Sequence, residues 1–218
     1  MSMSEQQVSL PRLNEPAPEF EALTTQGVKK LSDYRGKWVV LFSHPADFTP
    51  VCTTEFHGFA SRADEFEKRN VQLMGLSIDS VHSHLAWLQD IERIFHTKVP
   101  FPVIADLDMK VATLYGMVHP GASLTSAVRA VFVIDDNGVL RAMIYYPMSA
   151  GRNISEILRL VDSLQTTDKY GTPTPANWNP GEAVVVPPPA TASALETPEE
   201  AREKGLDFKS WYLRLKEL

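Results

Sequence analysis

The sequence contains one cysteine, Cys52, within the run Thr49-Pro50-Val51-Cys52. Thr49 is a good N-cap residue, and Pro50 suits the first helical position, where its missing N–H costs nothing. Cys52 then falls at the third helical position, where free backbone N–H groups and the positive end of the helix dipole lie. Both features favour a thiolate over a thiol, and the thiolate is the reactive form. The spacing therefore predicts an activated sulfur nucleophile.

Neighbouring residues add to this interpretation. A side chain at the third helical position turns back toward the cap, so we expect the Cys52 sulfur and the Thr49 hydroxyl to be close neighbours. Pro45 has no N–H to donate and would shield the sulfur without quenching it. A lone cysteine is by default an inert, buried apolar side chain, and spacing alone leaves that alternative open.

The pattern of apolar residues predicts the elements that position Cys52. Residues 38–43 lack polar alternation, as in a central strand buried on both faces. Helical periodicity follows over 49–70, where Phe56, Phe59 and Phe66 share one face. The other expected elements are two short strands within 20–31, a strand at 71–78, a helix at 81–96 with Val81, Leu85, Leu88 and Phe95 on its buried face, a strand at 103–105, a short helix at 108–115, a hairpin over 130–145 and a helix at 153–165. This order predicts an α/β protein with a thioredoxin-like fold and with Cys52 at the functional edge of its sheet.

The composition changes after residue 168, because seven of the 16 prolines lie in 168–218. We therefore expect a thioredoxin-like domain over 1–167 and an extended C-terminal arm over 168–218. The aromatic residues within 208–216 would not stay exposed to water. They are expected either to fold back on their own domain or to lie across a second subunit.

Composition also excludes several functions. The formal net charge of the 218 residues is −6, so the electrostatic attraction that nucleic acid binding needs is missing. No apolar run approaches the roughly 18–20 residues that span a bilayer, and the first residues lack a secretory profile, which favours the cytoplasm. One cysteine excludes an internal disulfide and a cysteine zinc cluster. No phosphate-binding or dinucleotide-binding motif is present, and we expect neither a cofactor nor a metal.

Residues 43–55, which read SHPADFTPVCTTE, resemble the peroxiredoxin signature Pro-x-x-x-Thr-x-x-Cys. The variant is the one found in the one-cysteine subgroup of the alkyl hydroperoxide reductase and thiol-specific antioxidant superfamily. Further matches lie at 128–135 and 145–153. The resemblance implies a thiol-dependent peroxidase that reduces hydrogen peroxide and organic hydroperoxides through a sulfenic acid at Cys52.

The resemblance also implies roles for the residues around the signature cysteine. Cys52 would be the nucleophile that attacks one peroxide oxygen. Thr49 would hydrogen-bond the peroxide, and Pro45 would shield the sulfur from solvent. The backbone amides of Val51 and Cys52 would hold the substrate in line for attack.

Four residues would support this centre. Arg129 would lie beside the sulfur and stabilise the charge that moves onto the leaving oxygen. Glu55 and Arg152 resemble the pair that orients Arg129, and His44 matches a subgroup position next to the sulfur. From the residues alone, the two arginines and the glutamate could equally be surface charges, and His44 could be a strand-end cap.

Other residues receive structural interpretations. His82 and His84 have the residue type of metal ligands, but positions i and i+2 do not share a helix face. We interpret both as surface residues. Trp87 and Trp211 are interpreted as packing residues.

Because the sequence holds no second cysteine, the sulfenic acid would be reduced by an external thiol, such as glutathione or a thioredoxin-like or glutaredoxin-like protein. The resemblance further implies a homodimer, in some members assembled into a decamer, with the arm as the dimer clamp. Two other functions stay open. One is a redox sensor or holdase chaperone whose oxidised Cys52 signals to a partner. The other is a catalytically silent thioredoxin-fold scaffold.

Overall fold

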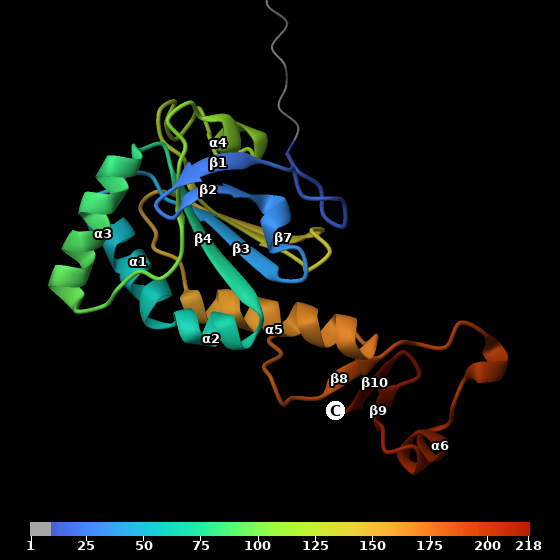
Figure 1. Ribbon diagram of the computed structural model, residues 1–218. Coiled ribbons are helices and arrows are strands. Elements are labelled where there is room, and N and C mark those ends of the chain that lie inside the picture. Colours follow the sequence, from blue (N-terminus) through green and yellow to red (C-terminus); the bar gives the residue numbers. More distant parts are fainter. Residues whose placement is uncertain (1–9) are drawn as a thin grey trace, which may run out of the picture. The chain divides into compact units, whose positions relative to one another are not determined.

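The computed structural model describes residues 10–218, which form two compact units, one ending at Ile154 and one running from Ser155 to Leu218 (Figure 1). The first unit is built on a seven-stranded sheet in the order β2-β1-β5-β4-β3-β6-β7. Its strands are β1 (Glu21–Thr24), β2 (Gly27–Lys30), β3 (Trp38–Ser43), β4 (Val71–Ser77), β5 (Val103–Ala105), β6 (Arg129–Ile134) and β7 (Leu140–Tyr146). Strands β3, β4 and β5 are parallel, and the other pairings are antiparallel. The predicted thioredoxin-like order is confirmed.

Four α-helices belong to this unit: α1 (Pro50–Ser61), α2 (Ala63–Lys68), α3 (Val81–Phe95) and α4 (Lys110–Leu114). A short 3₁₀ helix, η1, covers Leu31–Tyr34. The single helix predicted over 49–70 is in fact two helices, because Arg62 leaves the helical conformation with φ −117° and ψ 14°. The Arg62 N–H bonds to the Phe59 carbonyl at 3.3 Å, which tightens the end of α1.

The two faces of β3 bury different side chains, since residues alternate across a strand. On one face, Phe42 stacks on Phe59 of α1, with ring centroids 4.1 Å apart, and contacts Phe56 edge-on at 5.5 Å. On the other face, Val39 and Leu41 join a core cluster with side chains of α4 and of the N-terminal segment. Every residue of β3 is buried, so the strand that leads to Cys52 is fixed on both sides.

The second unit contains all but the first residue of α5 (Ile154–Tyr170), and also β8 (Val184–Val186), the 3₁₀ helix η2 (Ala192–Ala194), α6 (Pro198–Glu203), β9 (Asp207–Ser210) and β10 (Leu213–Lys216). The C-terminal arm also contains regular structure that the sequence did not predict, because β8, β10 and β9 form an antiparallel sheet. These strands of three or four residues are too short for a periodic signal. The buried Trp178 anchors the segment before them, since its backbone carbonyl accepts a 2.9 Å hydrogen bond from Arg159. The predicted boundary at 167/168 falls inside α5.

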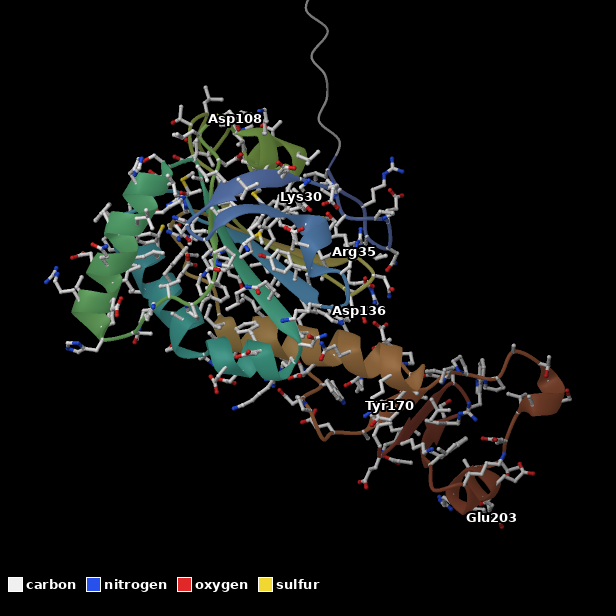
Figure 2. The ribbon with its side chains drawn as sticks, viewed as in Figure 1. Lys30, Arg35, Asp108, Asp136, Tyr170 and Glu203 are labelled. Atoms are coloured by element: carbon white, nitrogen blue, oxygen red, sulfur yellow. The ribbon has the colours of Figure 1, made fainter. Side chains whose placement is uncertain are left out.

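Some aromatic side chains of this second unit, unlike Trp178, stay open to solvent. Trp211 and Tyr212, which join β9 to β10, are 52% and 56% exposed in the single chain. Charged side chains such as Lys30, Asp108 and Glu203 likewise point outward (Figure 2). Across residues 10–218, no helix is both long enough and apolar enough to cross a membrane.

Candidate active site

Cys52 lies at the third position of α1, as the helix-start pattern predicts, and its side chain is 0% exposed. Thr49 is the N-cap residue, with extended φ −108° and ψ 147°. Its hydroxyl does not cap the helix but donates to the Ala46 carbonyl at 2.9 Å. The predicted closeness of the Thr49 hydroxyl to the Cys52 sulfur stays a prediction. Pro45 is half-buried in the turn between β3 and α1.

Arg129 opens β6 and is only 3% exposed, so the interpretation of this residue as a surface charge is wrong. Its Nη1 lies 3.3 Å from the Cys52 sulfur and 2.6 Å from Glu55 Oε2. Its Nε donates to the Met148 carbonyl at 2.9 Å. The guanidinium is therefore held on three sides, with one N–H directed at the sulfur.

Glu55 and Arg152 form the group that holds Arg129 in place. Glu55 follows Cys52 by three residues and so shares its helix face. Arg152 donates to both carboxylate oxygens of Glu55, from Nε to Oε1 at 2.9 Å and from Nη2 to Oε2 at 2.7 Å. Its Nη1 also bonds the carbonyls of Ser43 at 2.8 Å and Ala130 at 3.0 Å. The predicted positions of Glu55 and Arg152 next to Arg129 are found.

The charges of this cluster favour an anionic sulfur. Burial alone would raise the pKa of Glu55, but the hydrogen bonds and charge of Arg152, with a further contribution from Arg129, hold the pKa below its ordinary value of 4.5. Two guanidiniums and one carboxylate leave a net charge of about +1 in a buried region, and a buried charge is costly unless it is paired. A thiolate at Cys52 would supply the missing negative charge.

A second buried polar group begins at the residue after β3. His44 Nε2 lies 2.9 Å from Asp47 Oδ1, and His84 Nδ1 lies 2.8 Å from Asp47 Oδ2. The interpretation of His84 as a surface residue is wrong, because it is 0% exposed. Helix α3 buries His84, Trp87 and Ile91, not the predicted face. These three residues have the i, i+3, i+7 spacing of one helix face, but a histidine does not register as apolar in a search for that pattern.

The burial of this group sets its protonation. Burial would raise the pKa of Asp47, but the hydrogen bonds from His44 and His84 outweigh that effect and hold the pKa well below its usual range. Burial lowers the pKa of His44 more than Asp47 raises it. The ligand atoms of these three residues lie within 4.8 Å of one another, and their types suit a metal. Each nitrogen–oxygen contact quoted above is also of hydrogen-bond length.

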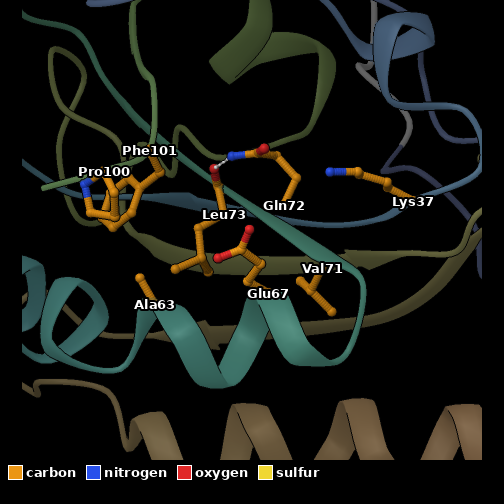
Figure 3. Close-up of a pocket in the computed structure, with 8 residues that line it drawn as sticks. All are labelled: Lys37, Ala63, Glu67, Val71, Gln72, Leu73, Pro100 and Phe101. Atoms are coloured by element: carbon orange, nitrogen blue, oxygen red, sulfur yellow. Dashed lines mark hydrogen bonds between the residues drawn. The ribbon is translucent and has the colours of Figure 1, made fainter.

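A separate hollow of about 200 Å³ lies in the same unit (Figure 3). Lys37 lies just before β3, and Val71 opens β4, so this hollow lies at the amino ends of two parallel strands. Cys52 follows the opposite, carboxyl end of β3. The hollow therefore does not belong to the site around Cys52.

Comparison with known proteins shows the family of this chain. The sequence profile of the AhpC/TSA family matches residues 13–143, and that of the C-terminal domain of 1-Cys peroxiredoxin matches residues 163–201. The chain belongs to the AhpC/TSA family. It is a one-cysteine peroxiredoxin and thus a thiol-dependent peroxidase.

Similar peroxiredoxins come from several organisms. A peroxiredoxin of Aquifex aeolicus is 56% identical over 217 residues, covering 94% of this chain and 96% of the relative. Peroxiredoxin 2 of Caldanaerobacter subterraneus subsp. tengcongensis is 55% identical, covering 97% and 95%. Two solved structures share the fold of this peroxiredoxin. The yeast mitochondrial 1-Cys peroxiredoxin has a TM-score of 0.83 at 45% identity over 96% of this chain and 100% of that one. A cysteine-to-serine mutant of peroxiredoxin 6 from Arenicola marina has a TM-score of 0.84 at 39% identity, covering 94% and 97%.

The Glu55 cluster predicts a stability effect in this peroxiredoxin. Glu55→Gln leaves two buried guanidiniums without a carboxylate and is expected to lower the free energy of unfolding by about 3–5 kcal/mol. Denaturant unfolding measures this change. Glu65→Gln is the control, since Glu65 pairs with Arg62 at the surface with a side chain 37% exposed, and the loss of a solvated ion pair should be far smaller.

The same variant has a pH signature. The pKa of Glu55 is lower in the folded state, so its contribution to stability is complete above the ordinary value of 4.5 and is lost as pH falls through the folded pKa. Glu55→Gln should therefore flatten the acid limb of the stability curve relative to Glu65→Gln. Equal losses in the two variants would contradict the role given to the cluster.

Proposed function

We propose that Cys52 is the peroxidatic nucleophile and that Arg129 activates it. The observation that carries this proposal is the 3.3 Å contact from Arg129 Nη1 to the sulfur at the third position of α1. The thiolate attacks the terminal oxygen of R–O–O–H, an S–O bond forms and the O–O bond breaks. The electron pair leaves with RO⁻, which takes up a proton to give ROH, and the sulfur is left as Cys–S–OH. The donor N–H of Arg129 stabilises charge as it moves from sulfur to the leaving oxygen.

The turn before α1 supplies groups for the substrate. The Thr53 N–H donates to the Thr49 carbonyl at 3.0 Å, so the amides of Val51 and Cys52 precede the first intrahelical hydrogen bond. These amides would hold the peroxide oxygens in line with the sulfur. The Thr49 hydroxyl would hydrogen-bond the peroxide once the substrate displaces the Ala46 carbonyl to which this hydroxyl donates. Pro45, without an N–H, would close the site without quenching the thiolate.

The second half of the cycle uses an outside thiol, because Cys52 is the sole cysteine of the sequence. A thiol R′SH reacts with the sulfenic acid to give a mixed disulfide and water, and a second thiol releases the Cys52 thiol and a disulfide product. The yeast mitochondrial relative has a thiol resolving mechanism via glutathione/thioredoxin systems. We infer glutathione, thioredoxin-like or glutaredoxin-like donors for this chain. A cytoplasmic location stays a prediction.

The reaction is tested by peroxide consumption with a panel of these donors. Cys52→Ser is expected to abolish turnover of hydrogen peroxide and of an alkyl hydroperoxide with every donor, because the nucleophile is gone. The donor with the highest turnover in the wild-type protein identifies the reductant class. Retained turnover in Cys52→Ser would refute the assignment, and stoichiometric oxidation of the wild type without turnover would favour a sensor.

Arg129 is tested in the same assay. Arg129→Ala should lower the second-order rate constant with peroxide by about 10²–10³-fold, since a charged donor is lost from the reacting atoms. The rate should also need a higher pH, because the adjacent cation no longer favours the thiolate. Arg141→Ala is the control, as Arg141 pairs with Asp135 beyond the far end of β6. If the pH profile of the rate is unchanged in Arg129→Ala, then Arg129 does not have the proposed role.

We further propose a homodimer that uses the second unit. Trp211 and Tyr212 are more than half exposed and contact each other edge-on at 5.6 Å, an exposed aromatic pair of the kind that a partner buries. The double variant Trp211→Ser, Tyr212→Ser is expected to lower the sedimentation mass from that of a dimer, or of a decamer built from dimers, toward that of one chain. Val28→Ser, at a residue 58% exposed in the first unit, is the control. An unchanged mass in the double variant would contradict this use of the second unit.

A further inference from the structure

The proposed mechanism gives no role to Asp47 and His84, although both are buried. His84 lies between two acceptors: Nε2 is 3.1 Å from the Ile104 carbonyl, and Nδ1 is 2.8 Å from an Asp47 carboxylate oxygen. The two ring nitrogens of His84 therefore tie the Asp47 carboxylate to strand β5.

The contact with Asp47 determines which ring nitrogen of His44 carries the hydrogen. An ionised carboxylate only accepts, so His44 Nε2 must be the donor in its 2.9 Å contact with Asp47 Oδ1. Burial lowers the pKa of His44, which keeps the ring neutral. A neutral ring with its hydrogen on Nε2 has a free lone pair on Nδ1. Nδ1 is buried and has no hydrogen-bond partner among the residues that the structure describes.

The free nitrogen belongs to a ring that packs against the turns of α1 carrying the sulfur. The His44 ring centroid lies 4.7 Å from that of Phe56, which is four residues after Cys52 and on the same helix face. It also lies 5.0 Å from Trp87, whose indole N–H donates to the hydroxyl of Thr53 at 3.2 Å. The ring is therefore enclosed by side chains that adjoin Cys52.

Resting on the proposed function, we propose that His84 is a positioning residue for the peroxidase reaction. Through Asp47 it fixes the ring orientation and the tautomer of His44, so that an unprotonated Nδ1 stays available beside α1. That nitrogen accepts a hydrogen bond from the O–H of the bound hydroperoxide. No covalent change at His84, Asp47 or His44 is required.

Two substitutions separate this role from simple anchoring of α3. His84→Asn keeps a donor near the position of Nδ1 and loses the bond to Ile104. His84→Gln keeps a donor near the position of Nε2 and loses the bond to Asp47. His82→Gln is the control, since His82 is exposed on the same helix. All four proteins, including the wild type, are freed of divalent cations with a chelator. The rate constant with hydrogen peroxide and the ¹⁵N NMR signals of the His44 ring are then measured.

The wild-type ring is expected to show a protonated Nε2 and an unprotonated Nδ1. His84→Gln should mix the two tautomers and lower the rate constant by about 10-fold, as loss of an orienting hydrogen-bond partner does. His84→Asn should lose less rate and keep the tautomer, and His82→Gln should match the wild type.

An unchanged His44 tautomer in His84→Gln would overturn the proposal, as would equal rate losses in His84→Gln and His84→Asn. If the tautomer shifts between variants as expected but the wild-type protein consumes no peroxide, the proposed function is refuted instead. The two failures are therefore distinguishable.

Discussion

The charge balance around Glu55 is the constraint on which the site depends. Arg129 and Arg152 are both buried, and one carboxylate cannot neutralise two guanidiniums. The Cys52 sulfur, 3.3 Å from Arg129 Nη1, is a nearby group that could carry the balancing negative charge. In the proposed mechanism, this surplus positive charge is what a thiolate at Cys52 would balance. In the proposed cycle the sulfenic acid is neutral, so the surplus returns after oxygen transfer. It then attracts the anionic thiolate that resolves the intermediate.

The ends of two antiparallel strands keep this balance in place. The Ser43 hydroxyl donates to the Val128 carbonyl at 2.6 Å and accepts from the Ala130 N–H at 3.1 Å, which ties the end of β3 to the start of β6. Arg129 lies between these two contacts in the chain. Arg152 adds a further tie, because its Nη1 bonds the carbonyls of both Ser43 and Ala130. Backbone groups of both strands thus hold Arg152, which in turn binds the Glu55 carboxylate that contacts Arg129.

Local signals were sufficient to predict part of this arrangement. Thr49, Pro50 and Cys52 start a helix for reasons contained in four residues, and strand β3 is evident from its apolar run. The burial of Arg129 was not predictable from composition or periodicity, because its partner Glu55 is 74 residues away and meets it only when β3 pairs with β6. Only the resemblance to the peroxiredoxin signature predicted that Arg129 lies beside the sulfur. The burial of His84 is also hard to predict, because a histidine is usually exposed and its partner Asp47 lies 37 residues away. The strands of the second unit are too short to show any periodicity.

Because the sulfur is completely buried, the two halves of the proposed cycle differ in how a reactant can reach it. A peroxide is small, and in the proposed mechanism the amides at the start of α1 would hold it beside the sulfur. A thiol protein is far larger and must bring its own sulfur within bonding distance of an atom that is 0% exposed. The segment between β3 and α1 is the part of the site with accessible residues, since Pro45 and Thr49 are half-buried and Phe48 is 58% exposed with a left-handed φ of 56°. In the proposed cycle, resolution by a thiol protein therefore requires this segment to move. The charge cluster, anchored on the strands, would keep Arg129 in place while the segment opens.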